Sequence, residues 1–563
     1  MLHLHKCLEA LKEFHVDVTG EVATLGVVAR ESNGIIRGLR GTGKSHLMLI
    51  TRDDINSSKE HLCIYINLQE HLSIGGNIIV QEKFYVWVLL KQLEKQIKYI
   101  IEDGKDKSTR KINVNTFVNF FKKDRDREVQ EKLEHVFKRL DELLMYGEKE
   151  FCDFEFERSE EKKVNQHRKG AIKAQVNATP SFEASVEESI EDGEAVSRKL
   201  KVKSALNLET LKSFLIELIN ILGINGITFF YDEWSTLSKS DQEVLSKLIR
   251  ALSSAPLYHW IAYIPYKSTL GVLEPTADLP HTLDLDLQFI YEENNKVCAN
   301  YFREFINKRL NMVFGTSKFN ASPLLRNELI ELLVKSSMGN TRDFGVMLNK
   351  AWNNYKHDYL ATKKNRVISK KHIERAIKSL AEEKMSNLQE KAVSKYSERL
   401  WADLVKFVSL KSHTHFCVEM SDKNIDYLKE AEFTDLLYHR LLHLRKKDYS
   451  PKDGDGTRLS IYSVDVSVLF FEIFETRSTE KKINLVTDVD TIHNQVRRYI
   501  FNVEDFVSQY RIEQGKQIKC INPDCKKIIT EDMKYALQNN VCTFCGTMLP
   551  HSEQALNVAL SRP

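Results

Sequence analysis

Residues 38–45 have the types and spacing of a phosphate-binding loop. They read Gly-Leu-Arg-Gly-Thr-Gly-Lys-Ser, which fits the pattern G-x-x-x-x-G-K-[ST] without a mismatch. Glycines let the backbone curl so that successive N–H groups point at phosphate oxygens. The loop therefore predicts a nucleoside triphosphate site, in which Lys44 reaches the β- and γ-phosphates and Ser45 binds Mg²⁺. The residues expected to hold the nucleotide are Gly38, Gly41, Thr42, Gly43, Lys44 and Ser45.

Two acids follow an apolar strand candidate later in the chain. Residues 226–232 read Gly-Ile-Thr-Phe-Phe-Tyr-Asp, and Glu233 comes next. A nucleotide site needs a carboxylate at a strand end to hold the water shell of the metal, so we expect Asp232 to bind Mg²⁺. Glu233 is placed to polarise the attacking water, which is the general-base role in phosphoryl transfer to water. For either acid alone, the simpler alternative is a residue that begins a helix.

Four of the nine cysteines cluster near the C-terminus. Cys520 and Cys525 form one pair, and after sixteen further residues Cys542 and Cys545 form another. This is the spacing of a zinc ribbon, and four thiolates predict a closed, structural Zn²⁺ site. The other cysteines are singles at long, odd intervals, which indicates a reducing compartment rather than a disulfide framework. Free or redox-active thiols are the alternative for the cluster.

A basic segment lies in the C-terminal part of the chain. Residues 436–447 contain four Arg or Lys residues, two His residues and no acid, and a turn at residues 451–456 separates them from the alternating residues 459–464. We interpret the segment as the recognition helix of a winged-helix domain. The alternative is an ordinary helix with a basic C-terminal end. The side chains predicted to contact DNA are Arg440, Arg445, Lys446, Lys447 and Arg458.

Alternating strands and helices must position the first two motifs. Strand candidates begin at residue 33 and continue at residues 61–67, 226–232, 259–265 and 281–290, with helical patterns between them. Such alternation predicts a three-layer α/β core with a parallel sheet, here residues 1–290. Residues 81–207 are an insertion into it.

The insertion begins with helical segments that end near Gly147. Its second half, residues 155–203, is poor in large apolar side chains and predicts a mobile loop or a weak helix. The rest of the chain divides into a helical lid at residues 291–388, a winged-helix-like domain at 389–513 and the zinc ribbon at 514–563.

Composition limits the class of protein. The chain has 563 residues, of which 42% are hydrophobic, and only 22 Gly and 10 Pro, so it can bury several cores. Its 82 basic and 79 acidic residues nearly cancel, so any nucleic-acid contact must come from a local patch. No run of 18 apolar residues and no secretory signal occurs, which predicts a soluble, cytoplasmic protein without membrane contact.

The motifs together resemble one family. The phosphate loop (Walker A), the Asp232-Glu233-Trp234-Ser235 block (Walker B) and Gly339-Asn340-Thr341-Arg342 are similar to those of bacterial AAA+ ATPases of the origin-recognition type. The resemblance covers residues 33–384 well and residues 389–513 loosely. It implies that Arg342, in the helical lid, senses the γ-phosphate and couples the lid angle to the nucleotide state. Thr341 stands where the family has proline.

Two further roles follow from the resemblance. A polar residue after the fourth strand should orient the water, and the candidates are Tyr266, Lys267 and Ser268. An arginine finger should reach a neighbouring subunit, but residues 270–282 contain no Arg or Lys and Arg250 is a poor substitute. The lack of an arginine finger favours a slow, switch-like ATPase over cooperative hydrolysis in a ring of subunits.

The expected protein therefore binds and hydrolyses ATP, with Mg²⁺ and Zn²⁺ as metals, and its nucleotide state controls its engagement of DNA. The resemblance also suggests antiviral defence against foreign phage DNA. A competing interpretation from another class is an ATP-gated switch that recruits an effector protein and has no DNA substrate. A homo-oligomer is compatible with both.

Overall fold

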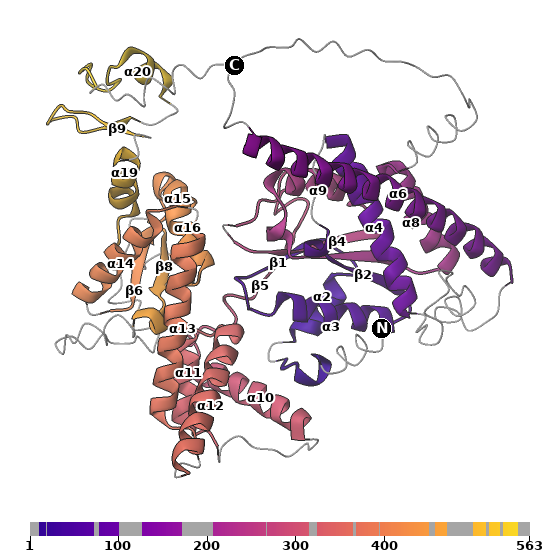
Figure 1. Ribbon diagram of the computed structural model, residues 1–563, viewed down its shortest axis with the longest axis horizontal. Helices are drawn as coiled ribbons and strands as arrows, with labels where there is room; N and C mark the ends of the chain where they lie inside the picture. The colour runs from indigo at the N-terminus through magenta and orange to yellow at the C-terminus, as the bar shows by residue number, and fades with distance from the viewer. Residues whose placement is uncertain are drawn as a thin grey trace. The chain divides into compact units, whose positions relative to one another are not determined.

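The computed structural model divides into two compact units, each with its own core (Figure 1). The first unit comprises Met1–Gly38, Gly43–Leu285 and Asn311–Ser317, and the second comprises Leu39–Thr42, Asp286–Leu310 and Lys318–Pro563. The residues that the structure describes are 11–17, 20–71, 78–100, 127–171, 206–265, 267–314, 324–363, 367–392, 394–411, 413–449, 457–469, 499–513, 517–529 and 533–549.

The first unit is built on a five-stranded parallel sheet in the order β2-β3-β4-β1-β5. Its strands are β1 (Gly34–Arg37), β2 (His61–Asn67), β3 (Gly226–Asp232), β4 (Leu257–Tyr263) and β5 (His281–Asp284). All seven residues of β3 are buried, because β-branched and aromatic side chains face helices on both sides of the sheet. The predicted parallel α/β sheet is confirmed, although β4 lies two residues earlier than expected and β5 ends at Asp284.

Helices cover both faces of this sheet (Figure 1). On one face, α2 (Glu21–Val28) and α3 (Lys44–Ser57) pack through Leu25, Met48 and Ile55. The helices on the other face are α4 (Ile78–Ile100), α6 (Arg127–Ala171), α8 (Leu208–Leu222) and α9 (Lys239–Leu252). The short 3-10 helices η1 (Leu68–Glu70) and η2 (Trp234–Thr236) follow β2 and β3. The three layers give the sheet two buried faces and leave its strand ends for a site.

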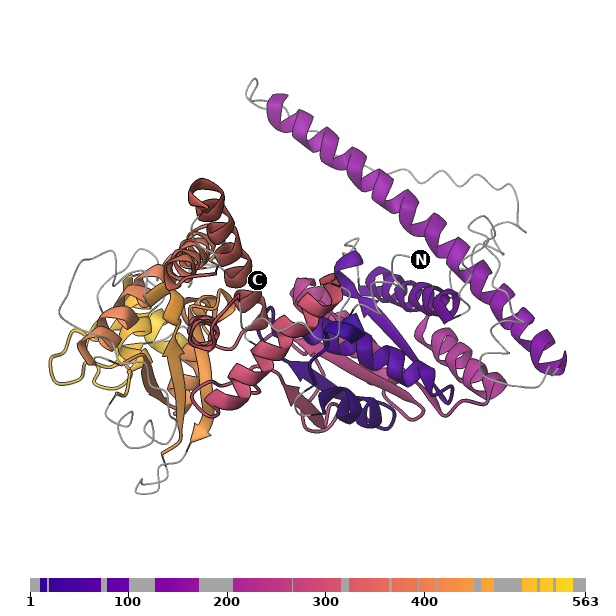
Figure 2. The same ribbon diagram turned by 90° about the horizontal axis from the view of Figure 1, so that it is seen from below.

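The described part of the insertion includes the long helix α6, which Figure 2 shows as a continuous rod. Its predicted apolar face is confirmed, since Leu133, Val136 and Leu140 are buried against the core. The expected end near Gly147 is wrong. A Cβ at Gly147 would lie 2.1 Å from Trp87, so this glycine permits close packing of α6 on α4 rather than ending the helix. Of the predicted loop or weak helix at 155–203, residues 172–203 lie outside the described residues.

The second unit begins with helices that share one core. They are α10 (Asn295–Phe314), α11 (Asn327–Ser336), α12 (Thr341–Thr362) and α13 (Lys370–Lys391). Phe302, Phe344 and Ile377 are among the side chains buried between them. The described part of the predicted helical region after residue 290 is therefore helical.

A smaller α+β part follows. Its elements are α14 (Ser397–Lys411), β6 (His415–Glu419), α15 (Asp422–Leu428), α16 (Ala431–Tyr438), β7 (Leu442–Tyr449), β8 (Leu459–Val464) and α19 (Val503–Glu513). The three strands form an antiparallel sheet in the order β6-β8-β7. The strand expected at residues 459–464 is confirmed as β8, and the turn at residues 451–456 lies outside the described residues.

The recognition helix predicted at residues 436–447 is wrong. Helix α16 ends at Tyr438, Arg440 takes a positive φ of 60°, and a strand begins at Leu442. The stretch Leu-His-Leu-Arg alternates apolar and polar side chains, which is a strand pattern. Pairing with β8, from Leu442 opposite Val464 onward, favours the extended form over the helix.

The C-terminal ribbon consists of β9 (Ile518–Lys519), β10 (Ile528–Ile529) and α20 (Lys534–Asn539) around a very small core. Among the described residues, no helix is both long enough and apolar enough to cross a bilayer.

Candidate functional site

The predicted phosphate loop joins the end of β1 to the start of α3. Gly41 and Gly43 have φ values of 91° and 100°, which only glycine adopts without strain, so the backbone takes the curled form that the motif requires. No side chain caps the N-terminus of α3, which begins at Lys44. The helix dipole favours negative charge at this end of α3.

Lys44 lies inside this loop rather than in solvent. Its side chain is 8% exposed, and its Nζ donates a hydrogen bond of 2.7 Å to the carbonyl oxygen of Gly38. Ser45 follows it at the second position of α3 and is half-buried. The Thr42 hydroxyl donates to the Leu39 carbonyl and closes the turn. The Lys44 ammonium is therefore held within the loop by a backbone carbonyl.

The two acids lie at the carboxyl end of β3, where Asp232 is the last residue of the strand and Glu233 follows it. Asp232 is 2% exposed, and both of its carboxylate oxygens accept hydrogen bonds: from the Tyr65 hydroxyl at 2.6 Å and from the Glu233 N–H at 2.8 Å. Glu233 is half-buried. Within the described ranges, Asp232 forms no ion pair with Lys, Arg or His, so its buried charge is met by neutral donors alone. A buried carboxylate in this state suits a cation.

Tyr65 is a site residue that the sequence analysis missed. It comes from β2, which is 167 residues from Asp232 in the chain, and the parallel pairing of β2 with β3 brings the two together. Burial and the nearby Asp232 carboxylate raise the pKa of Tyr65 far above its usual value, so its hydroxyl stays protonated and donates. The only sequence signal was a tyrosine near the end of an otherwise apolar strand.

Parallel pairing places the candidate residues at one edge of the sheet. The carboxyl ends of parallel strands share an edge, and β4 lies between β1 and β3. The connection after β1 runs over one face through α3, whereas α8 and α9 on the other face precede β3 and β4. Ligands of open α/β sheets bind where connections diverge in this way.

Of the three residues proposed to orient the water, Tyr266 lies outside the described residues. Lys267 is exposed. The Ser268 hydroxyl is buried and has no hydrogen-bond partner in the described part of the chain. The indole N–H of Trp234 donates to the Thr269 carbonyl at 2.8 Å, which ties the segment after β3 to the segment after β4.

Glu233 has a left-handed backbone, with φ 56° and ψ 34°. This conformation costs a non-glycine residue about 1–2 kcal/mol, and strain of this kind gathers at functional sites. We expect Glu233→Gly to leave the free energy of unfolding unchanged or to raise it by up to about 1 kcal/mol, because relief of the strain outweighs the added entropy of the unfolded chain. Urea denaturation would measure the difference.

Lys59 provides a matched control for this substitution. It is exposed and has a φ of 62°, so Lys59→Gly should give a similar stability change away from the site. If Glu233→Gly lowered the free energy of unfolding by more than about 1 kcal/mol and Lys59→Gly did not, the Glu233 side chain would be shown to stabilise the fold.

In the second unit, the start of α12 contacts loop residues 39–42. Asn340 caps α12 by accepting from the N–H groups of Arg342 and Asp343, and its amide donates to the Arg40 carbonyl at 3.2 Å. The Arg342 N–H donates to the Gly41 carbonyl at 3.3 Å. A Cβ at Gly41 would lie 2.5 Å from the Arg342 Cβ, so glycine is needed here for contact as well as for φ.

Thr341, the departure from the family motif, takes part in the same contact. It occupies the first position of α12, where proline would also fit because no intrahelical N–H bond is made there. Its hydroxyl donates to the Gly41 carbonyl at 2.7 Å. Threonine therefore adds a hydrogen bond to the loop that proline could not make.

Two of the residues predicted to contact DNA are engaged inside the fold. Arg445 is 4% exposed and pairs with Glu292 and with the Met338 carbonyl. Arg440 is 16% exposed and pairs with Asp343 at 3.0 Å. These placements correct the prediction for both, since their cationic groups pair with the buried acids Glu292 and Asp343. Lys447 and Arg458 are exposed, and Lys446 is half-buried.

A buried ionic cluster joins the four-helix part of the second unit to the α+β part. Lys384 of α13 lies 2.8 Å from Asp343 and 2.8 Å from Asp465, and His443 lies 2.9 Å from Asp465. Burial alone would raise the pKa of Asp343 and of Asp465, but Lys384 and the neighbouring cations outweigh it and hold both below their usual values. Removing one member of such a cluster leaves an unpaired buried charge.

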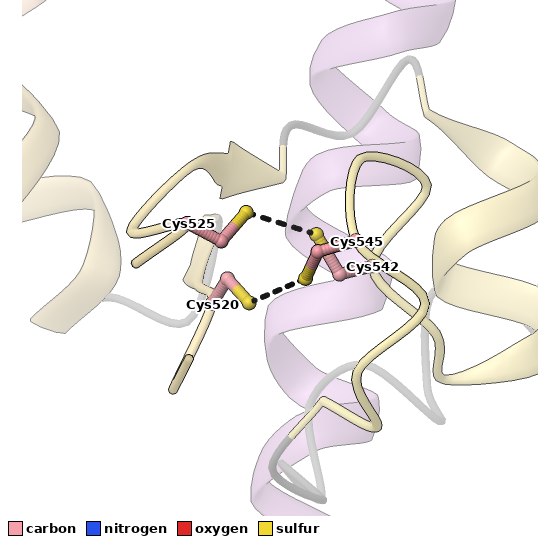
Figure 3. Close-up of side chains that lie close together, drawn as sticks. All are labelled: Cys520, Cys525, Cys542 and Cys545. Carbon is pink, nitrogen blue, oxygen red and sulfur yellow. Dashed lines mark hydrogen bonds between the residues drawn. The ribbon is translucent and has the colours of Figure 1, made fainter. Parts of the chain in front are cut away.

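The four cysteines of the ribbon lie close enough together that they could hold a metal ion, as their spacing predicts (Figure 3). Their sulfur atoms all lie within 4.8 Å of one another and point toward a common centre, with Cys520 and Cys545 3.6 Å apart and Cys525 and Cys542 3.8 Å apart. Tetrahedral Zn–S bonds of about 2.3 Å place sulfurs about 3.8 Å apart. The donor set and its geometry therefore fit Zn²⁺.

Compared with known proteins, the chain matches no family model and no curated protein.

Proposed function

We propose that the chain binds and hydrolyses ATP as an AAA+ protein of the origin-recognition type, and that its nucleotide state controls engagement of DNA. The observation that carries the proposal is the loop between β1 and α3. Its glycines have the left-handed φ values of a phosphate cradle, its lysine is folded inward, and the helix it opens has no side-chain cap.

In this proposal the loop N–H groups and Lys44 bind the β- and γ-phosphates. Ser45 and Asp232 hold Mg²⁺, which would neutralise charge on the phosphates. Tyr65 keeps the Asp232 carboxylate oriented by its hydrogen bond. Glu233 accepts the proton of the attacking water, and Ser268, with its unpartnered hydroxyl, is the best supported of the three groups that could orient that water.

Arg342 is proposed to sense the γ-phosphate from the start of α12. Its place against Gly41 supports this role. The next residue, Asp343, belongs to the buried cluster with Lys384 and Arg440, so a movement of α12 would carry the α+β part with it. This gives a route from nucleotide state to the C-terminal part of the chain.

The α+β part is proposed to be a winged-helix domain, because its helices and strands alternate as helix, strand, two helices and a hairpin. Helix α16 carries no basic side chain, so the DNA contact is assigned to the hairpin. Lys447 near the end of β7 and Arg458 just before β8 are exposed, and these two strands pair in the hairpin.

The test is DNA binding and ATP hydrolysis by the whole chain. We expect duplex DNA to bind with a steep salt dependence, to change the hydrolysis rate, and to bind differently with ADP than with an ATP analogue. Lys447→Ala combined with Arg458→Ala should lower the slope of log affinity against log salt by about 1.8, since each phosphate contact contributes about 0.9.

Lys363→Ala, at the exposed residue that follows α12, is the control and should leave the slope unchanged. Hydrolysis that is indifferent to DNA, together with no binding at low salt, would favour the competing function, a nucleotide switch that recruits an effector protein.

A further inference from the structure

The metal end of the ribbon exposes apolar side chains that a small domain would be expected to bury. Ile521 is 63% exposed, Phe544 is 54% exposed and Met548 is 60% exposed. Ile521 lies between the first two cysteines, and Phe544 lies between the last two. The two turns face each other across the four sulfurs, and Asn522 donates to Thr547 at 3.4 Å. These side chains therefore belong to one end of the ribbon.

Lysines accompany the exposed ring. Lys526 and Lys527 follow Cys525 directly, both are exposed, and the Lys527 Nζ lies 5.9 Å from the centre of the Phe544 ring. In the described ribbon residues 517–529 and 533–549 there are four lysines and one acid, Asp524. A zinc ion with four thiolates carries a charge of −2, so the lysines offset this charge and leave the surface close to neutral. A ligand of this surface would therefore have to contact the Phe544 ring as well as the lysines.

We propose that this knuckle surface, defined by Ile521, Lys526, Lys527, Phe544 and Met548, binds single-stranded DNA. An exposed aromatic ring beside ammonium groups matches an unpaired base joined to phosphates, because the base stacks on the ring and the lysines contact the backbone. The bases of a duplex are stacked on one another and cannot offer their faces to Phe544. The choice of DNA over RNA rests on the proposed function.

The experiment measures binding of a fluorescent oligothymidine strand to the intact, zinc-loaded chain by anisotropy. Phe544→Ala should weaken binding about 5- to 150-fold, which corresponds to the loss of one stacked base. Phe544→Tyr keeps a ring and should retain the affinity. Lys526→Ala with Lys527→Ala should lower the salt slope by about 1.4, at about 0.7 for each single-strand phosphate. Metal analysis of each variant establishes that zinc is retained.

The matched control is a second aromatic ring with a lysine beside it, outside the ribbon. On α12, the Lys363 Nζ lies 5.4 Å from the centre of the Tyr359 ring, which is 36% exposed. Tyr359→Ala should leave single-strand binding unchanged. Unchanged affinity in Phe544→Ala, an equal loss for Tyr359→Ala, or tighter binding of the matching RNA strand would overturn the proposal.

Single-strand binding at the knuckle surface and ATP hydrolysis can be tested separately. If Phe544→Ala has no effect while ATP hydrolysis and duplex binding persist, only the knuckle proposal is lost. If hydrolysis is absent but single-strand binding depends on Phe544, the ribbon site stands and the ATPase assignment is lost.

Discussion

Glu233→Gln should lower the rate of ATP hydrolysis about 100- to 10,000-fold, the usual contribution of a general base, while ATP binding is retained. Glutamine keeps the size and hydrogen bonding of the side chain but cannot accept the proton. Lys44→Ala should instead weaken nucleotide affinity, because it removes the ammonium that we propose to bind the phosphates and that lies within the loop. Single-turnover hydrolysis and equilibrium binding of a fluorescent ATP analogue would separate the two effects.

Two exposed residues provide controls for these substitutions. Glu243→Gln changes a surface acid of α9 that pairs with Lys247, and Lys59→Ala removes an exposed lysine at the end of α3. Both variants should bind and hydrolyse ATP as the parent chain does. A Glu233→Gln variant that hydrolyses ATP at the parent rate would remove Glu233 from the role of base.

Loss of zinc should unfold the ribbon without affecting nucleotide binding. The buried core of the ribbon is Ile518, Cys520, Ile529, Ala536, Cys542 and Leu549, and two of these six are candidate metal ligands. So few buried apolar side chains cannot stabilise a folded ribbon by themselves. The binding free energy of a structural Zn²⁺, about 10–16 kcal/mol, can do so. We therefore expect about one Zn²⁺ per chain, and a protease-sensitive C-terminal end after chelation or in Cys542→Ser.

Cys417→Ser is the control for the zinc experiment, because Cys417 is buried in β6 away from the cluster. It should keep the metal. Nucleotide binding, measured after the zinc and chelator are removed and Mg²⁺ is restored, should be unchanged, since the first unit has its own hydrophobic core. Protein that carries no zinc when prepared without chelator, or a ribbon that resists protease equally with and without metal, would contradict the assignment.

Arg440 and Arg445 were predicted to contact DNA at the surface, but both pair with acids inside the fold. As part of a basic, acid-free stretch, they favour a nucleic-acid surface. Their acids come from far away in the chain: Asp343 lies 97 residues from Arg440 and Glu292 lies 153 residues from Arg445. No local pattern reports such partners, so only Lys447 and Arg458 still support the DNA proposal on the hairpin.

The sequence alone was sufficient for features that depend on neighbouring residues. The loop at residues 38–45 is set by glycine positions and by the strand and helix next to it, and the bounds of β2 and β3 follow from short apolar runs. The four cysteines were identified because the ligand spacing of a zinc ribbon is a property of two short turns. In each case the residues that decide the structure lie within a few positions of one another.

Only the tertiary structure decided the rest. It placed the Tyr65 hydroxyl on Asp232, made residues 442–449 a strand by pairing them with β8, and put Arg342 against Gly41, 301 positions earlier in the chain. Each of these contacts joins segments that are distant in sequence, and each depends on the register of strands or on the packing of helices. A local pattern specifies what a segment can form, whereas burial against distant partners selects which of those forms is most stable.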